Sequence, residues 1–185
     1  MKPNKSTFTL FPKNAYIMQI ANNKVVELLY ELRLDSATSE AFETTTPENP
    51  FVFLFGANNV LPDFETHLNG LKAGDKFSFS IESENGYGEY DEEAIVELPR
   101  NIFEVDGKLD ENMVKAGNVL PMRDQDGHAM NGTVVEVKSD VIVMDFNHPL
   151  AGKNLFFSGT IASVREATEE ELDHGHVHGP HGHHH

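Results

Sequence analysis

Cysteine is absent from this chain of 185 residues, so a disulfide framework and thiolate chemistry are both excluded. No apolar stretch is long enough to span a bilayer. The N-terminal segment lacks the shape of a signal peptide, because its apolar patches are short and are broken by Lys13, Asn14 and Asn22. We therefore expect a cytoplasmic protein with no membrane partner.

Positive charge is scarce: 14 Lys and Arg residues stand against 30 Asp and Glu residues, which gives a net charge of −16. Such a surface repels phosphate backbones and attracts cations, so we expect no nucleic-acid partner. Hydrophobic residues make up 39% of the chain and include 13 Phe, which is enough to build a core. The length fits one domain, or one domain that carries a smaller one.

Apolar periodicity predicts the elements of the N-terminal half, after a loose arm at residues 1–14. Two strands, 15–21 and 24–36, are expected to meet at an Asn-Asn pair, because Asn tolerates the positive φ of a tight turn. A loop rich in Ser, Thr and Pro at 36–50 precedes a buried strand at 51–55, which is apolar on both faces.

A helix is predicted within residues 58–75. Pro62 suits its first turn, and Gly70 or Gly74 can end it. The next strand, 76–83, alternates so that its apolar side chains share one side, as in a half-buried antiparallel strand. The apolar helix face consists of Leu61, Phe64, Leu68 and Leu71, and the apolar strand side of Phe77, Phe79 and Ile81.

The chain changes character at about residues 95–148, where short strands alternate with Asp-Gly and Ser-Asp turn signals. This segment could close as a small β unit of its own. A long strand at 154–166 follows it, and Thr168 with Glu171 offers a capping box that opens a short, exposed helix. These elements predict an α+β fold, in which an antiparallel sheet packs one helix and is interrupted by an insert.

Three segments together resemble FKBP-type peptidyl-prolyl cis-trans isomerases, with the bacterial SlyD subgroup as the close match. The first is an apolar strand, a Gly and a helix entry followed by GLKAGDKF (70–77). The second is GYGEYDE (86–92), and the third runs from NHPLAGKNLFF (147–157) into the His-rich end of the chain. The resemblance covers roughly residues 24–181, and it is the order and spacing of the segments that make it specific.

The resemblance implies a curved antiparallel sheet that wraps one helix, with an apolar cleft between them. It assigns residues 1–94 plus 149–168 to the FKBP-like isomerase domain. It assigns 95–148 to a mostly β insert-in-flap domain with chaperone function, and 169–185 to a short helix and a metal-binding tail. Some apolar residues of the insert are candidates for binding unfolded chains, although some of them must form the insert's own core. These residues are Val134, Val135, Ile142, Met144 and Phe146.

The resemblance also implies an isomerase site that needs no cofactor. Tyr87 would point its hydroxyl at the substrate carbonyl, and Glu43 stands where the family commonly has Asp. Without the resemblance, each Phe of the site would more often be an ordinary core residue. Tyr87 would be a turn residue, and Glu43 would be a solvated carboxylate. The catalytic set is Tyr87, Phe157, Phe51, Phe64, Tyr30 and Glu43, and the substrate-binding set is Phe42, Val60 and Leu61.

Seven of the ten histidines lie in the last twelve residues. Imidazole suits Ni²⁺ and Zn²⁺, so this tail is expected to bind such ions as protons leave the rings. Interrupting Gly, Val and Pro residues argue against a plain expression tag, although the last three histidines fit either origin. The remaining His67, His128 and His148 are interpreted as surface, turn and structural residues without ligand-like spacing. The tail ligands are His174, His176, His178, His181, His183, His184 and His185.

The sequence therefore predicts a monomeric isomerase and folding chaperone that acts on unfolded or proline-containing polypeptides and binds divalent metal ions. Two alternatives stay open. One is a chaperone with weak or no isomerase activity, and the other is a metal-handling protein in which the tail is primary. Activity in a proline-limited refolding assay would distinguish an isomerase from a chaperone without catalysis. Metal binding measured with and without the tail would test the metal-handling alternative.

Overall fold

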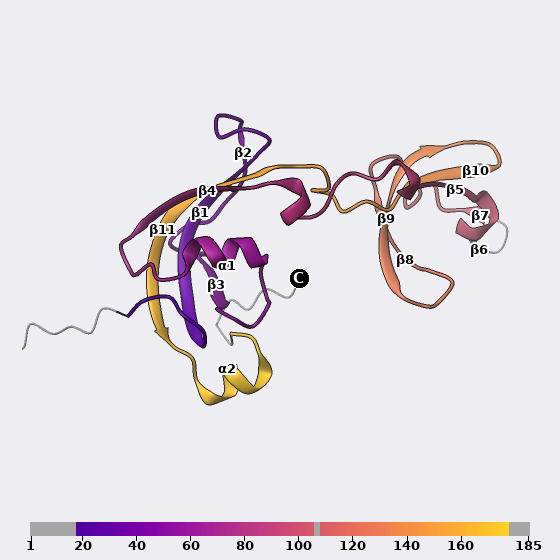
Figure 1. The fold of residues 1–185 in the computed structure, drawn as a ribbon. Coiled ribbons are helices and arrows are strands. Elements are labelled where there is room, and N and C mark those ends of the chain that lie inside the picture. The colour runs from indigo at the N-terminus through magenta and orange to yellow at the C-terminus, as the bar shows by residue number, and fades with distance from the viewer. Residues whose placement is uncertain (1–17, 106–107, 178–185) are drawn as a thin grey trace, which may run out of the picture. The chain divides into compact units, whose positions relative to one another are not determined.

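The computed structural model describes residues 18–105 and 108–177 (Figure 1). It divides by compactness into two units, which we describe separately. The first unit comprises the described residues of Met1–Ile81 and Leu155–His185, and the second comprises those of Glu82–Asn154. Among the described residues, no helix has the length and apolar character needed to cross a membrane.

A five-stranded antiparallel sheet forms the frame of the first unit. The long strand β1 lies at its centre, with β11 along one side and both β2 and β3 along the other. The remaining strand, β4, pairs with the far side of β11. The strands are β1 (Lys24–Leu34), β2 (Ala41–Thr44), β3 (Phe51–Leu54), β4 (Lys76–Ile81) and β11 (Leu155–Glu166).

Helix α1 (Pro62–Leu68) lies within the curve of this sheet, as Figure 1 shows. Pro62 occupies its first turn, where a missing N–H breaks no helical bond. Phe64 and Leu68 are buried, as the predicted apolar face requires. The helix ends at Asn69, whose N–H donates to the Glu65 carbonyl, so the helix is shorter than the predicted segment.

Three expectations for the first unit differ from the structure. The predicted strand 15–21 is reduced to an isolated bridge between Gln19 and Lys72, and its residues 15–17 lie outside the described part of the chain. The predicted loop 36–50 contains β2, because three of its residues pair with β1. Val52 of β3 is 40% exposed, since β3 pairs only with β1 and one of its faces remains open.

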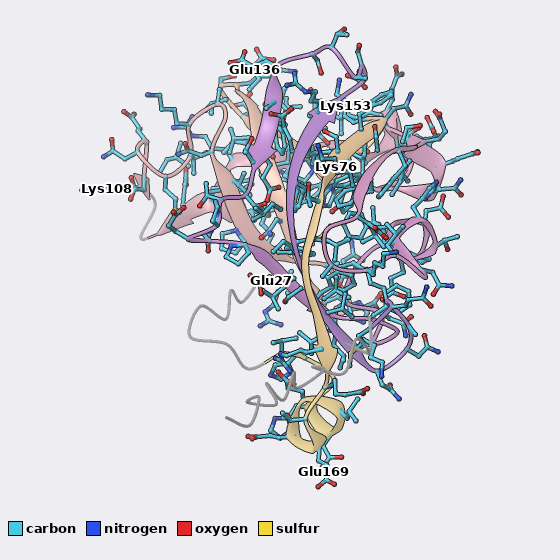
Figure 2. All side chains as sticks on the ribbon, turned by 90° about the vertical axis from the view of Figure 1, so that its left-hand side faces the viewer. Glu27, Lys76, Lys108, Glu136, Lys153 and Glu169 are labelled. Atoms are coloured by element: carbon cyan, nitrogen blue, oxygen red, sulfur yellow. The ribbon has the colours of Figure 1, made fainter. Side chains whose placement is uncertain are left out.

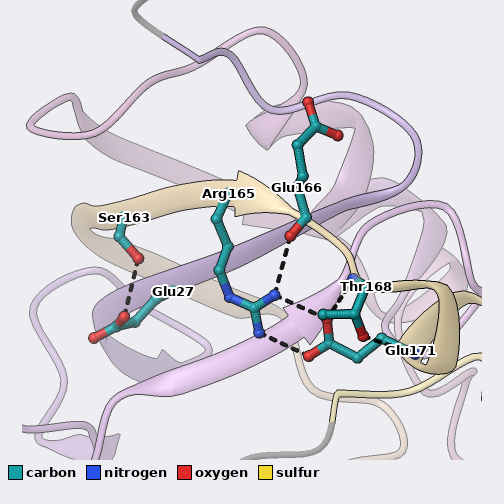
Figure 3. Close-up of polar contacts among 6 residues, drawn as sticks. All are labelled: Glu27, Ser163, Arg165, Glu166, Thr168 and Glu171. Atoms are coloured by element: carbon teal, nitrogen blue, oxygen red, sulfur yellow. Dashed lines mark hydrogen bonds and ion pairs between the residues drawn. The ribbon is translucent and has the colours of Figure 1, made fainter.

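The short helix α2 (Glu169–His174) begins at the predicted capping box, in which Thr168 accepts from the Glu171 N–H. Glu169 points outward from the helix (Figure 2). Glu171 was expected to be exposed, and this is wrong: it is only 3% exposed. Its two carboxylate oxygens accept from the Arg165 guanidinium at 2.7 and 2.8 Å, which compensates the buried charge (Figure 3).

The second unit contains a four-stranded antiparallel sheet in the order β5-β10-β9-β8 and a small two-stranded sheet of β6 and β7. The predicted Asp-Gly turn joins β8 to β9, with Gly127 at a φ of 88° that disfavours other residues. The strands are β5 (Ile95–Pro99), β6 (Glu104–Val105), β7 (Lys108–Leu109), β8 (Val119–Arg123), β9 (Ala129–Val137) and β10 (Val141–Asp145). Three 3-10 helices accompany them: η1 (Ser83–Asn85), η2 (Glu92–Ala94) and η3 (Arg100–Phe103).

One face of this sheet carries the core of the second unit. Three of the five residues that the sequence offered as client-binding candidates, Val134, Ile142 and Met144, are fully buried there. Phe146 packs against the same core, whereas Val135 is 46% exposed. The buried core consists of Phe103, Val114, Leu120, Val134, Ile142 and Met144.

Candidate active site

A set of aromatic rings from four strands and one helix fills the concave side of the first unit's sheet. The strand register places these rings on one face, because Leu32, Phe157 and Phe79 lie opposite one another across three strands. Helix α1 then adds Phe64 from above that face. The members are Tyr30 of β1, Phe51 and Phe53 of β3, Phe64 of α1, Phe79 of β4 and Phe157 of β11.

Phe64 is the hub of this aromatic set. Its ring centroid lies 4.9 Å from that of Phe157, 5.6 Å from that of Phe79 and 6.3 Å from that of Phe51, all with the rings edge to face. Edge-to-face contacts at such distances are favourable because ring edges and faces carry opposite partial charge. Phe64 and Phe157 are buried, while Phe51 stays half-buried and offers part of its ring to solvent.

Tyr30 connects the aromatic set to a carboxylate. Its ring packs edge to face on Phe51 and on Phe157, with centroids 5.7 and 5.6 Å away. Its hydroxyl donates a 2.7 Å hydrogen bond to Oε1 of Glu43 on β2. Glu43 therefore reaches the aromatic set through the Tyr30 hydroxyl.

Gly159 makes the close packing beside Tyr30 possible. It lies opposite Tyr30 on β11, and a Cβ at this position would come 2.1 Å from the Leu29 carbonyl oxygen. The same Cβ would lie 2.7 Å from Cζ of Phe77. Because one obstacle is backbone, no side chain fits without moving strand β1.

The three predicted substrate-binding residues occupy two different places. Phe42 lies where the pairing of β1 with β2 shifts register, and it is 57% exposed. Val60 and Leu61 are half-buried in the segment that enters α1, next in sequence to the buried hub of the aromatic set. Asn59 in this segment donates through Nδ2 to the Gly175 carbonyl just after α2.

Tyr87, the remaining predicted catalytic residue, belongs to the second unit. It lies just after η1 and is 41% exposed. Its ring stacks face to face on His148, with centroids 4.0 Å apart and planes within 1° of parallel. Burial lowers the pKa of His148 below its usual range, which favours the neutral imidazole.

The sequence interpretation missed two further members of the aromatic set. Phe53 and Phe79 contact Phe64 as closely as the predicted members do, with centroids 6.0 and 5.6 Å away. Phe79 also stacks on His67 at 4.4 Å, so this histidine covers an aromatic ring from the exposed side of α1. The alternation of 76–83 was the available signal for Phe79, since it places that ring on the same side as Phe77 and Ile81.

Two shallow hollows lie on the sheet of the first unit, and Tyr30 of the aromatic set lines the second of them. One is bordered by Lys76 and Ser78 of β4 and the other by Thr44 and Thr45 beside β2. Both include Glu31, Ser158 and Thr160, whose strand positions alternate with the buried ones. Neither hollow is lined by Phe51, Phe64 or Phe157.

Two groups carry residues of the kinds that bind metals. In the β8–β9 turn, ligand atoms of Asp124, Asp126 and His128 lie within 4.8 Å of one another, which corrects the view that His128 has no carboxylate at ligand-like spacing. Hydrogen bonds within the turn account for this grouping, since Asp124 accepts from the backbone and ring of His128 and has a lowered pKa. These three residues are all exposed.

Two of the predicted metal-binding histidines of the tail, His174 and His176, lie at the end of α2. The rings of His174 and His176 are 5.8 Å apart, and Nδ1 of His176 hydrogen-bonds with the His174 carbonyl. The other predicted ligands lie outside the described residues: His178, His181, His183, His184 and His185.

Comparisons with known proteins point to one family. The family model described as FKBP-type peptidyl-prolyl cis-trans isomerase matches residues 18–108. The chain is 37% identical over 164 residues to the FKBP-type peptidyl-prolyl cis-trans isomerase SlyD of Escherichia coli (strain K12), covering 89% of this chain and 80% of that protein. It is 35% identical to SlyD of Vibrio cholerae (87% and 76% covered) and 33% identical to SlyD of Haemophilus influenzae (89% and 82% covered).

Proposed function

The chain belongs to the FKBP-type peptidyl-prolyl cis-trans isomerases, and we propose that its aromatic set isomerises X-Pro bonds of proline-containing polypeptides. The motifs in the sequence predicted this family, and the matches confirm it. The antiparallel sheets and the single main helix of the first unit agree with it. The observation that carries the site assignment is the mutual contact of Tyr30, Phe51, Phe64 and Phe157.

The reaction is rotation about a C–N bond with partial double-bond character, whose barrier is about 18–20 kcal/mol. Uncatalysed exchange takes on the order of tens to hundreds of seconds, slow enough to limit folding. No covalent bond breaks, so neither a nucleophile nor a cofactor is required. Only contacts that are stronger in the twisted state than in the planar state accelerate the rotation, and each gain of about 1.4 kcal/mol gives a tenfold rate increase.

An aromatic surface meets this requirement for the proline ring. Water favours the charge-separated, planar amide, so a surface that displaces water favours the twisted bond. We assign the proline contact to the accessible part of the aromatic set, where Phe51 is half-buried, and to the adjoining Val60 and Leu61. Buried Phe64 packs on Phe51, and buried Phe157 packs on Phe64 in turn.

We assign hydrogen-bonding roles in the reaction to one tyrosine of each unit. The Tyr30 hydroxyl is oriented by Glu43, which accepts its proton in a 2.7 Å hydrogen bond. Tyr87 would donate its hydroxyl to the substrate carbonyl, as the family resemblance implies. Phe42, at 57% exposure, offers an apolar contact to residues that flank the proline.

A proline-limited refolding assay tests the assignment. Tyr30→Phe keeps the ring contacts but removes the hydrogen bond to Glu43, and Tyr87→Phe removes the other hydroxyl. We expect each to lower kcat/KM several-fold, about the effect of one hydrogen bond of 1 kcal/mol. The matched control is Tyr90→Phe, an exposed tyrosine that donates to Asp145 and lies outside the proposed site.

The outcomes separate cleanly. Unchanged kcat/KM in both Tyr30→Phe and Tyr87→Phe would mean that neither tyrosine hydroxyl contributes to catalysis. Absence of isomerase activity in the wild-type chain would favour the alternative, a chaperone that has lost catalysis. An equal fall in Tyr90→Phe would mean that the loss of any tyrosine hydroxyl perturbs the protein and that the site is wrongly assigned.

We further propose that the second unit is the family's insert-in-flap domain and holds unfolded clients. Its compact bounds, Glu82–Asn154, are wider than the predicted 95–148 at both ends and include Tyr87. Support comes from the number of its exposed apolar side chains, because accessible apolar surface is typical of sites that bind other chains. These side chains include Ile95, Val96, Ile102, Met113, Val119, Met130, Val135 and Val137.

The His-rich tail is proposed to bind Ni²⁺ or Zn²⁺. His174 and His176 lie close to each other at the end of α2, and imidazole is a suitable ligand for both ions. Titration calorimetry on the chain and on a variant that lacks residues 174–185 tests this. Equal metal affinity of the full chain and the truncated variant would mean that the metal binds outside the tail. If the truncated variant lost isomerase activity as well as metal binding, the tail would not be a separate module.

A further inference from the structure

The stacking of Tyr87 on His148 is the closest ring contact in the described part of the chain. Its centroid distance of 4.0 Å is shorter than that of every contact in the aromatic set. The two residues are distant in sequence, on the two segments that lead into and out of the second unit's strands. Such a contact restricts the tyrosine ring to one orientation.

His148 is itself held in place. The Leu150 N–H donates to Nδ1 of His148 at 3.1 Å, which requires Nδ1 to be an acceptor and puts the proton on Nε2. The lowered pKa agrees with a neutral ring. The Ala151 N–H also donates to the His148 carbonyl at 2.9 Å, so both ends of this residue are fixed in the turn that precedes β11.

The backbone beside Tyr87 is tied down independently. The Gly88 N–H donates to the Ser83 carbonyl at 2.8 Å, and the Gly152 N–H donates to the Gly88 carbonyl at 2.7 Å. The Ser83 N–H donates to Oδ1 of Asn154 at 3.0 Å. The main chain around Tyr87 is therefore held by residues 152–154, which follow His148 in sequence. Tyr87 itself is 41% exposed to solvent.

We propose that His148 is a positioning residue for isomerisation, and that its flat ring holds Tyr87 in the orientation that meets the substrate carbonyl. This inference rests on the proposed role of Tyr87. An exposed tyrosine on a surface segment otherwise samples several rotamers, and each alternative reduces the fraction ready to act. Holding one orientation before the substrate arrives raises the rate because no ordering remains to be done during the reaction.

Two substitutions of similar size separate positioning from simple space filling. His148→Phe and His148→Leu both remove the acceptor for Leu150, but only Phe keeps a flat ring for Tyr87. We expect kcat/KM on a short proline peptide to fall about fivefold in His148→Leu, with most of the loss recovered in His148→Phe. A residue with a merely structural role would show equal losses in both variants.

A double-mutant cycle with Tyr87→Ala completes the test. If His148 acts through Tyr87, His148→Leu lowers kcat/KM in the wild-type background and not in the Tyr87→Ala background. Equal losses in both backgrounds, or equal activity of the Leu and Phe variants, would overturn the proposal. Full activity of Tyr87→Ala would instead overturn the proposed role of Tyr87 itself, so the two failures are distinguishable.

Discussion

The two units of this chain handle apolar side chains in opposite ways. In the first unit the aromatic rings of the sheet and of α1 pack on one another, and among its described residues only Phe42, Val52 and Leu172 are large apolar residues with high exposure. In the second unit the sheet buries a small core on one face. Among the described residues, ten of the thirteen exposed large hydrophobic side chains belong to it.

This difference fits the two proposed tasks. Catalysis of bond rotation needs groups fixed before the substrate arrives, and close ring packing supplies that rigidity. Holding varied unfolded chains needs accessible apolar surface that tolerates different partners. Each unit therefore has a packing style suited to one task. Apart from Tyr87 and His148, which we assign to isomerisation, variants that alter the packing in one unit should leave the other task intact.

The largest expected effect concerns two glycines, one in each sheet. A Cβ at Gly159 would meet the Leu29 carbonyl oxygen, whereas a Cβ at Gly132 would meet the tips of Phe146 and Met144, at 2.7 and 2.8 Å. Side-chain tips can move and a paired strand cannot. We expect Gly159→Ala to lower the free energy of unfolding by about 3 kcal/mol and Gly132→Ala by about 1 kcal/mol.

Urea unfolding of the whole chain, followed through amide signals of β11 and of β9, measures the two effects separately. Gly159→Ala should shift the β11 transition, and Gly132→Ala should shift the β9 transition by less. Equal shifts for the two variants would contradict the view that the first unit is the more rigidly packed.

The second prediction concerns the exposed valines. Val119→Thr with Val135→Thr changes two exposed side chains of the second unit, at 54% and 46% exposure, into polar residues of the same shape. We expect the second unit to suppress aggregation of an unfolded client several-fold less well. Each substitution removes apolar contact area with the client, and this contact contributes about 25 cal/mol for every Å² buried. The matched control in the first unit is Val52→Thr, at 40% exposure, which should leave client protection unchanged.

The outcome that contradicts this prediction is loss of protection in the Val52→Thr control, or full protection in the double variant. Full protection in the double variant would mean that clients do not bind through Val119 and Val135. Loss of protection in the Val52→Thr control would mean that client binding is not confined to the second unit. Isomerisation of a short proline peptide should be the same in all these variants.

The third prediction concerns acid stability of the first unit. Arg165 and the backbone of Thr168 lower the pKa of Glu171 from 4.5 to about 2, so its contribution is complete above pH 4.5 and is lost as the pH falls through 2. After allowance for the exposure of Arg165, we expect Glu171→Gln to reduce the free energy of unfolding by about 1–2 kcal/mol at pH 7. The difference from wild type should vanish near pH 2.

Unfolding followed at β11 over pH 2–7 checks this prediction. The control is Glu170→Gln, the exposed neighbour, whose stability should follow that of wild type. A pH-independent difference between Glu171→Gln and wild type would show that the carboxylate charge is not what stabilises α2.

The smallest effect is expected at the exposed pair of Lys24 and Glu166, which joins β1 to β11. It lies next in sequence to Arg165, which pairs with Glu171 of α2. The Glu166 side chain is 66% exposed, so water and salt screen the charges. We expect Glu166→Gln to change the free energy of unfolding by no more than about 0.5 kcal/mol. A change as large as that of Glu171→Gln would contradict the distinction between exposed and buried ion pairs here.

Much of the fold could be predicted because its strands obey simple patterns. Residues 76–81 alternate, and the capping box at Thr168 marks the start of α2. Strand β2 was missed because its four residues lack an alternating apolar pattern, are mostly exposed and gain their structure from pairing with β1. The burial of Glu171 was missed because only the folded chain brings it onto Arg165.

The site was predictable only in part, for a related reason. Tyr30, Phe51, Phe64 and Phe157 are far apart in sequence, and only the family resemblance grouped them. Their contacts, and the bond from Tyr30 to Glu43, depend on strand register that no local pattern encodes. Likewise, nothing in the local sequence of His148 indicates that Tyr87 stacks on it.

The most direct test of the division of labour measures kcat/KM on two substrates, a short proline peptide and an unfolded protein with proline-limited folding. The first variant is Phe51→Leu, which thins the accessible part of the aromatic set, and the second is the Val119→Thr and Val135→Thr double variant. We predict that Phe51→Leu lowers kcat/KM about tenfold on both substrates, and that the double variant lowers it only on the protein. Full activity of a folded Phe51→Leu variant on both substrates would contradict the central claim.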